Sequence, residues 1–126
     1  MTQSTGMNTP KLSIIICVYN EEPNIQPLNR WINESIDDID YEIIYVDDGS
    51  TDRTREEIIG LADPKVVMVE FRKNYGQSSA LYAGIEIARG EYLVTMDGDL
   101  QNDPSDIPMM LDIAEKGDWD LVAGVR

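Results

Sequence analysis

Residues 12–18 read LSIIICV, a run dominated by apolar and β-branched side chains. Such a run is typical of a strand that is buried on both faces of a parallel sheet. Residues 41–46 (YEIIYV), 65–71 (KVVMVEF) and 91–96 (EYLVTM) have the same character, and residues 120–123 begin a similar run. The sequence therefore predicts a sheet of buried strands.

The first two segments between these strands have helical patterns. Behind Pro23, apolar side chains recur at helical spacing in the order Ile25, Leu28, Trp31, Ile32 and Ile36, which predicts an amphipathic helix. The polar run 52–62 (DRTREEIIGLA) predicts a second helix. We expect Ser50 or Thr51 to be its N-cap, because serine and threonine accept hydrogen bonds from exposed N–H groups of a first turn.

Two more helices are expected further along the chain. Residues 77–89 are rich in small side chains and precede Gly90, which we expect to cap the helix end. Asp103 followed by Pro104 is typical of an N-cap and a first-turn proline. The helix that follows places its apolar residues on one face and ends at Gly117; these residues are Ile107, Met110, Leu111 and Ala114.

Alternating strands and helices indicate an α/β fold, doubly wound, with a mainly parallel sheet and helices on both faces. A length of 126 residues allows one domain. We expect residues 1–10 to be a disordered leader and residues 11–126 to form one unit without internal repeats.

Charge and hydropathy exclude several classes of function. Ten Lys plus Arg against 24 Asp plus Glu give a net charge of −14, which repels nucleic acids and anionic lipids. The apolar run 14–18 is far shorter than the roughly 20 residues of a membrane helix. The first ten residues, MTQSTGMNTP, lack the pattern of a secretory signal. We therefore expect a cytoplasmic chain with no nucleic-acid partner and no membrane span.

The residue inventory also limits the chemistry. With Cys17 as the only cysteine, the chain has no internal disulfide and no multi-thiolate metal site. With no histidine, it has no His-ligated zinc and no Ser-His-Asp triad. Any chemistry must therefore depend on carboxylates.

Polar residues follow three of the predicted strands, where ligands of doubly wound sheets bind. They are Tyr19, Asn20 and Glu21; Asp47 and Asp48; and Asp97, Gly98 and Asp99. Two carboxylates about 4 Å apart repel by roughly 4 kcal/mol at an effective dielectric constant near 20. A divalent cation would offset this repulsion, and hard oxygen ligands favour Mg²⁺ or Mn²⁺. GxxxxGK[ST] and GxGxxG motifs are absent, which argues against P-loop kinases and NAD enzymes.

Four ordered segments carry a family resemblance: CVYNEEPNI (17–25), EIIYVDDGSTDRT (42–54), RKNYGQSSALYAGIEIARGEYLVTMDGDLQNDP (72–104) and LVAGVR (121–126). They resemble the family 2 glycosyltransferases, in particular the polyprenyl-phosphate sugar transferases, the group that includes dolichol-phosphate mannose synthase. The resemblance implies the nucleotide-binding, Rossmann-like half of a glycosyltransferase A fold. It also implies a metal-dependent, inverting transfer of a sugar from a UDP- or GDP-linked donor to a lipid-phosphate or glycan acceptor.

The family pattern assigns roles to particular residues. Cys17, where the family commonly has proline, flanks the nucleoside together with Tyr19 and Glu21, and Asp47 and Asp48 accept hydrogen bonds from the base or ribose. Gly98 contacts the nucleotide, Asp97 and Asp99 hold ribose and metal, and Gln101 completes the metal shell. Gly124 and Arg126 fall on the glycine-x-arginine pattern, whose guanidinium pairs with the diphosphate.

The resemblance also implies that the acceptor-binding half lies beyond Arg126. We therefore expect these 126 residues to bind a donor without turnover, and a longer protein to work at the cytoplasmic face of a membrane. The sequence indicates neither a catalytic base nor an oligomeric state.

Three alternatives stay open on the residues alone. The DDGSTD segment at 47–52 has the composition of a plain solvated turn. The chain could be a non-catalytic module that binds nucleotide sugar and Mg²⁺. A receiver domain that accepts phosphate on aspartate has a similar size, but its acidic pair would follow the first strand, where Tyr19, Asn20 and Glu21 stand.

Overall fold

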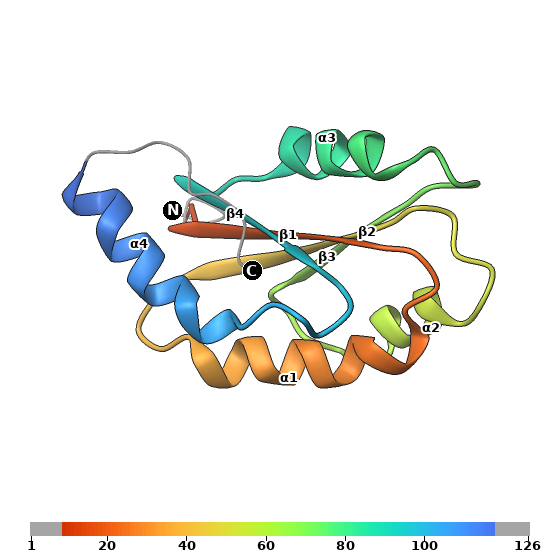
Figure 1. Ribbon diagram of the computed structural model, residues 1–126, viewed down its shortest axis with the longest axis horizontal. Helices are drawn as coiled ribbons and strands as arrows, with labels where there is room; N and C mark the ends of the chain where they lie inside the picture. Colours follow the sequence, from red (N-terminus) through yellow and green to blue (C-terminus); the bar gives the residue numbers. More distant parts are fainter. Residues whose placement is uncertain (1–8, 118–126) are drawn as a thin grey trace, which may run out of the picture.

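A computed structural model describes residues 9–117 as one α/β unit (Figure 1). Its elements follow in the order β1 (Leu12–Val18), η1 (Glu22–Asn24), α1 (Ile25–Ser35), β2 (Tyr41–Asp47), α2 (Thr54–Ile59), β3 (Val66–Glu70), α3 (Gln77–Ile87), β4 (Tyr92–Asp97), η2 (Pro104–Asp106) and α4 (Ile107–Lys116). All neighbouring strands are parallel, in the spatial order β3-β2-β1-β4. The predicted fold class is confirmed.

The register of the sheet brings three strand ends together. Pairing of β1 with β2 ends at Val18 opposite Asp47, and pairing of β1 with β4 ends at Cys17 opposite Asp97. The order of the strands reverses between β1 and β4, because β2 and β3 lie on one side of β1 and β4 lies on the other. Such a reversal is where doubly wound sheets bind ligands.

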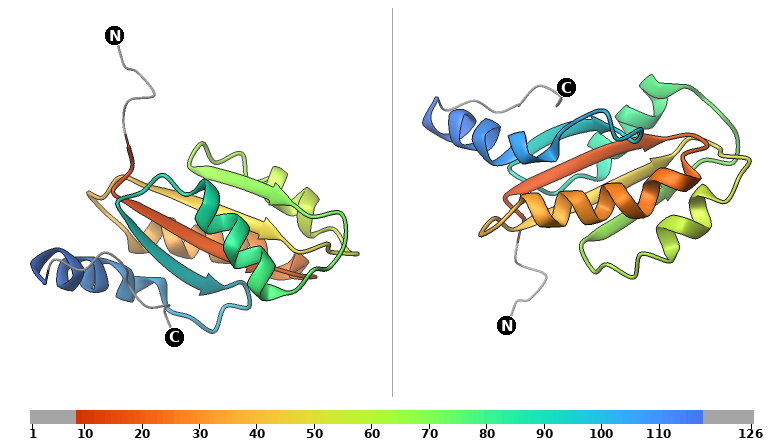
Figure 2. Two further views of the ribbon diagram at one scale, coloured as in Figure 1. Left: turned by 90° about the horizontal axis from the view of Figure 1, so that it is seen from above. Right: turned by 60° about the horizontal axis from the view of Figure 1, so that its bottom comes forward.

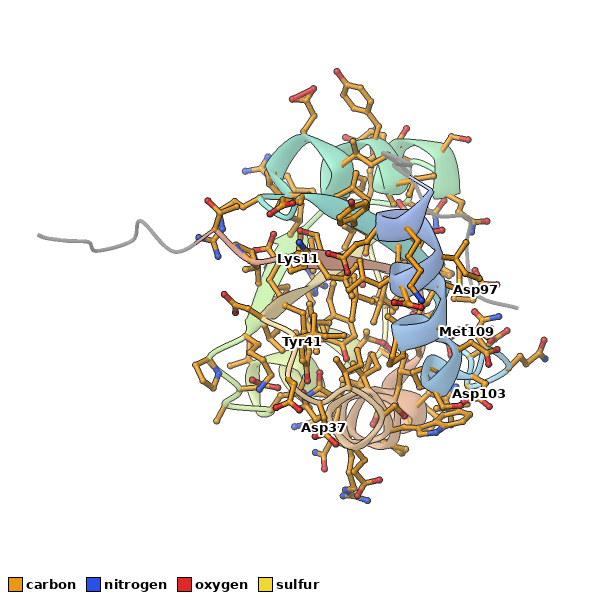
Figure 3. The ribbon with its side chains drawn as sticks, turned by 90° about the vertical axis from the view of Figure 1, so that its left-hand side faces the viewer. Lys11, Asp37, Tyr41, Asp97, Asp103 and Met109 are labelled. Atoms are coloured by element: carbon orange, nitrogen blue, oxygen red, sulfur yellow. The ribbon has the colours of Figure 1, made fainter. Side chains whose placement is uncertain are left out.

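Helices cover both faces of the sheet, with α3 on one side and α1 and α2 on the other (Figures 1 and 2). The larger core lies on the α1 side, where Ile25, Leu28 and Ile32 pack against the strands and Ile107 joins from α4. Outside this core, Met109 of α4 is exposed (Figure 3). The helical periodicities predicted for α1 and α4 are therefore confirmed.

The face under α3 is covered more thinly. Ala80 of α3 packs against Ile15 and Ile44, and Gly84 lies so close to β1 that a Cβ there would be 2.5 Å from Ile15 Cγ2. Small side chains thus allow α3 to lie directly on the strands.

Two predicted helix caps are wrong. The second helix begins at Thr54, so Ser50 and Thr51 precede it, and the Thr54 N–H donates to the Asp52 side chain at 2.9 Å. The third helix ends at Ile87, before Gly90. The Gly90 N–H instead donates to Ser13 Oγ at 2.8 Å. The second helix is therefore capped by a local contact two residues away from Thr54, whereas Gly90 contacts β1.

Some predictions concern residues outside the range 9–117 that the structure describes. Strand 120–123 and the residues Gly124 and Arg126 lie outside the described residues, as does most of the leader expected over residues 1–10. Pro10 is buried, and its carbonyl accepts the Glu91 N–H at 3.3 Å. Within residues 9–117, no helix has the length and hydropathy needed to cross a membrane.

Candidate functional site

An open hollow of about 310 Å³ lies at the carboxyl ends of β1 and β4. Its lining residues are Cys17, Val18, Tyr19, Glu21, Asp48, Gln77, Asp97, Gly98 and Asp99. Four of them are carboxylates and none is a lysine or arginine, within the part of the chain that the structure describes. The strand ends therefore meet on one rim, as predicted, and the binding roles of these residues stay predictions.

Asp48 is almost buried, at 5% exposure, and joins two loops. Its N–H donates to the Val18 carbonyl at 2.9 Å. Its two carboxylate oxygens accept the N–H groups of Tyr75 at 2.8 Å and Gly76 at 3.0 Å. The carboxylate thus fixes the segment that leads into α3.

The loop after β4 is supported by a buried residue to which the sequence pattern assigns no role, Asn102. The Asp97 N–H donates to Oδ1 of the buried Asn102 at 2.7 Å. Gln77 Nε2 lies 3.5 Å from Asp97 Oδ1, and Asp99 Oδ1 accepts the Gln101 N–H at 3.2 Å. Gln101 is exposed and is not among the lining residues.

The loop after β1 is bound to the loop after β2 through Asn20. The Asn20 N–H donates to Ser50 Oγ at 2.9 Å, and Asn20 Oδ1 accepts the Thr51 N–H at 2.8 Å. The next residue, Glu21, donates its N–H to Thr54 Oγ1 and accepts from Asn24 Nδ2 at 2.8 Å. Glu21 is therefore held at the hollow by two contacts.

Cys17 and Tyr19 form the less polar part of the wall. Burial, with added repulsion from Asp48 and Asp97, raises the pKa of the Cys17 thiol to about 11. The thiol is therefore protonated at neutral pH and presents a small, uncharged surface. The Tyr19 side chain is 45% exposed, so its ring remains accessible at the edge.

Asp47 does not line the hollow, in contrast to its predicted contact with the nucleotide. It is fully buried, accepts hydrogen bonds from the N–H and hydroxyl of Ser50, and lies 3.3 Å from Arg55 Nε. The sequence pattern assigns no role in the site to Arg55, Gln77 or Asn102. Gln77 alone had a usable signal, because it directly follows the glycine that opens a helix at the same sheet edge.

The oxygen atoms of the hollow suit a divalent cation only if a bound ligand supplies the remaining coordinating atoms. Within residues 9–117, no three side chains of His, Cys, Asp or Glu form a ready-made metal cluster. Asp97 and Asp99 nevertheless supply hard oxygen donors side by side in the hollow. Mg²⁺ is commonly held by one or two carboxylates together with substrate phosphates, and this pair fits that mode.

Curated relatives of similar sequence are named as polyprenyl-phosphate enzymes. The chain is 40% identical over 130 residues to a dodecaprenyl-phosphate galacturonate synthase of Rhizobium johnstonii, covering 96% of the chain and 38% of the relative. It is 42% identical over 120 residues to an undecaprenyl-phosphate 4-deoxy-4-formamido-L-arabinose transferase of Pseudomonas fluorescens, covering 91% of the chain and 35% of the relative. The chain thus spans little more than a third of these proteins.

Two solved structures share the fold. The mannosyltransferase PcManGT from Pyrobaculum calidifontis, in complex with GDP-Man and Mn²⁺, superposes with a TM-score of 0.67 at 28% identity over 79% of this chain and 30% of that one. S. aureus TarS 1-349 with UDP-GlcNAc gives a TM-score of 0.70 at 24% identity, over 84% of this chain and 31% of that one. Residues 13–126 match the model of the family described as glycosyl transferase family 2. The chain therefore belongs to glycosyl transferase family 2, with a glycosyltransferase A fold, and not to the receiver domains.

Proposed function

We propose that the chain forms the donor-binding part of an inverting, metal-dependent glycosyltransferase that moves a sugar from a nucleoside diphosphate to a polyprenyl phosphate. The observation that carries this proposal is the rim of four carboxylates at the sheet's reversal point, in a chain of this family. The names of the curated relatives support the lipid-phosphate acceptor. The complex of PcManGT with GDP-Man and Mn²⁺ supports the donor class and the cation.

The side chains divide between the nucleoside and the cation. Cys17 and Tyr19 offer an apolar wall and an accessible ring for the nucleoside, with Glu21 beside them. Asp48 already accepts two backbone N–H groups. A carboxylate has about four lone-pair sites, so Asp48 retains about two sites for donor groups of the base or ribose.

Asp97 and Asp99 are the residues that would hold Mg²⁺ or Mn²⁺. Gln101 is exposed and does not line the hollow. It would join the metal ligands only if its loop changed conformation. When bound, such a cation acts as a Lewis acid that stabilises the negative charge of the departing diphosphate. Gly98 lies between the two aspartates, and a Cβ there would be 2.7 Å from Val18 Cγ1, so its lack of a side chain keeps this loop close to β1.

The charge of the site explains why binding should depend on the cation. The hollow carries four carboxylates without a lysine or arginine from the described residues, and the whole chain has a net charge of −14. A bare diphosphate would be repelled by this field. The phosphate of the proposed acceptor is already ionised at neutral pH, so transfer needs no strong general base. A lipid acceptor would bring the longer protein to the cytoplasmic face of a membrane.

Titration calorimetry of the chain with UDP- and GDP-sugars, each with and without Mn²⁺, tests the donor site. We expect Mn²⁺-dependent heat with one of the two nucleotide classes. Asp99→Asn should weaken it about tenfold or more, because one ionised ligand is lost. Asp112→Asn is the matched control, because Asp112 lies exposed on α4, where it pairs with Lys116. The absence of Mn²⁺-dependent heat with every nucleotide would contradict the proposal.

A sugar-transfer assay with a polyprenyl phosphate tests whether these residues suffice for catalysis. The chain spans 38% and 35% of the two relatives named above, so we expect donor binding without sustained turnover. Sustained turnover by the 126-residue chain would show that the acceptor site lies within it.

A further inference from the structure

The buried Asp47–Arg55 pair is not explained by direct contact with a donor. The Asp47 side chain is fully buried and lies outside the lining of the hollow. Its Oδ2 accepts no well-formed hydrogen bond within residues 9–117, although Arg55 Nε lies 3.3 Å away. A buried carboxylate is retained only where a partner compensates its charge. Arg55 is that partner.

The Arg55 guanidinium joins three segments. In addition to Asp47 at the end of β2, Nη2 donates to the Ser50 carbonyl at 3.0 Å, and Nη1 donates to Glu70 Oε2, at the end of β3, at 2.6 Å. A planar guanidinium can serve three acceptors in fixed directions, whereas a lysine ammonium on its flexible stem cannot reproduce this fork. The geometry therefore depends on arginine and not only on positive charge.

This clamp fixes the turn that presents Asp48. Asp47 Oδ1 accepts the Ser50 N–H at 3.2 Å, which closes the turn over residues 47–50. Within this turn Gly49 rests on the neighbouring loop, since a Cβ there would lie 2.2 Å from the Lys73 carbonyl carbon. Asp48 then holds the N–H groups of Tyr75 and Gly76. The position of the loop before α3 thus follows from the turn that Arg55 holds.

We propose that Arg55 is a positioning residue of the donor site, acting through Asp47 and the Ser50 carbonyl on Asp48 and on the loop of residues 72–76. The ligand in this inference comes from the proposed function. The route from Arg55 to the site comes from the contacts described above. Arg55 lies beneath the site, outside the residues that line it. Its effect on a nucleotide is therefore transmitted by the placement of Asp48 and Gln77.

Amide hydrogen exchange of the ligand-free chain tests the path. Arg55→Lys keeps the charge and removes the fork, so we expect the Tyr75 and Gly76 amides to exchange about tenfold faster, while β1 amides keep their protection. Arg53→Lys is the matched control, since it makes the same chemical change at an exposed residue of the same segment. Unchanged exchange at Tyr75 and Gly76 in Arg55→Lys would overturn the proposal. Equal loosening of the whole sheet would also overturn it, because Arg55 would then be merely structural.

Calorimetry with UDP and GDP in the presence of Mn²⁺ gives a second readout. Arg55→Lys should weaken nucleotide binding about tenfold, because a charge-assisted contact no longer holds the turn, and Arg53→Lys should leave it unchanged. In an Asp47→Asn background, Arg55→Lys should have a smaller effect than in the wild-type chain, because only the contact of Arg55 with the Ser50 carbonyl is then left to lose. Additive losses would overturn this path. A wild-type chain that binds neither nucleotide would contradict the proposed function, and the exchange measurement would still decide the role of Arg55.

Discussion

Replacing Gly49 with alanine should damage the site more than its small size suggests. Gly49 has φ +76°, and a Cβ there would lie 2.2 Å from the Lys73 carbonyl carbon and 2.5 Å from the Asn74 nitrogen. The left-handed backbone costs alanine about 1 kcal/mol. The collision is with backbone, which cannot rotate away, so overpacking adds about 1–3 kcal/mol. We expect urea unfolding to show a loss of about 2–4 kcal/mol for Gly49→Ala.

Gly76→Ala separates the two contributions. Gly76 also has positive φ, at +102°, but nothing lies within 4 Å of the position its Cβ would take. This variant should therefore show only the conformational penalty, about 1–2 kcal/mol. If Gly49→Ala is no more destabilising than Gly76→Ala, the two loops are not packed as described, and the argument that the turn of Asp48 supports the loop before α3 fails.

Three further predictions concern stability and reactivity. Burial tends to raise the pKa of Asp63, but hydrogen bonds from two asparagines of α1 and the Lys65 N–H lower it to about 2. The pKa of Asp63 in the folded chain is thus below its unfolded value of about 4. About 1–2 kcal/mol of stability should therefore be lost as pH falls from about 4 to about 2, and urea titrations of Asp63→Asn should lack that loss. Gly84→Val should lower the unfolding free energy by about 2–3 kcal/mol, because its Cβ would be 2.5 Å from Ile15 Cγ2; an unchanged urea midpoint would contradict this. Iodoacetamide should alkylate Cys17 at pH 8 about a hundredfold more slowly than a free thiol, since its pKa is about 11; alkylation at the rate of glutathione would show that the thiol is not shielded.

The strands were the most predictable part of the fold. The runs at Leu12–Val18 and Tyr41–Asp47 are buried along nearly their whole length, so the apolar pattern alone defines them. The caps of α2 and α3 were wrong for a common reason. Ser50 and Gly90 carry strong local capping signals, but Ser50 bonds to Asp47 and Asn20, and Gly90 packs on Leu12 and Ser13. At Ser50 a contact within the turn and one with Asn20 replace the predicted cap, and at Gly90 the contact with β1 does so.

The site was predictable as far as strand order determines it. Parallel strands place all their carboxyl ends on one edge, so Glu21, Asp48 and Asp99 could be brought together without coordinates. Gln77, the first residue of α3, and the loop residue Asn102 were not found, because polar amide side chains are common and only the folded backbone shows what they contact. The ion pair of Asp47 with Arg55 depends on how α2 packs against β2, which the sequence pattern does not specify.

Side-chain alternation explains why adjacent aspartates have different surroundings. In β2, Ile43 and Tyr45 face the core under α1 and α2, whereas Ile44 and Val46 face α3. Period-two alternation continues this pattern, so Asp47 turns toward Arg55 of α2 while Asp48 turns toward the start of α3. The same alternation places Cys17 and Asp97 on the α3 face, since their neighbours in β1 and β4 belong to the other core; these neighbours are Ile16, Val18 and Met96. The hollow therefore lies on the face covered by a helix of small residues, and the Asp47–Arg55 pair lies on the densely packed face. The densely packed core on one face of the sheet can therefore hold the carboxylates in place, while the hollow on the other face stays open to a ligand.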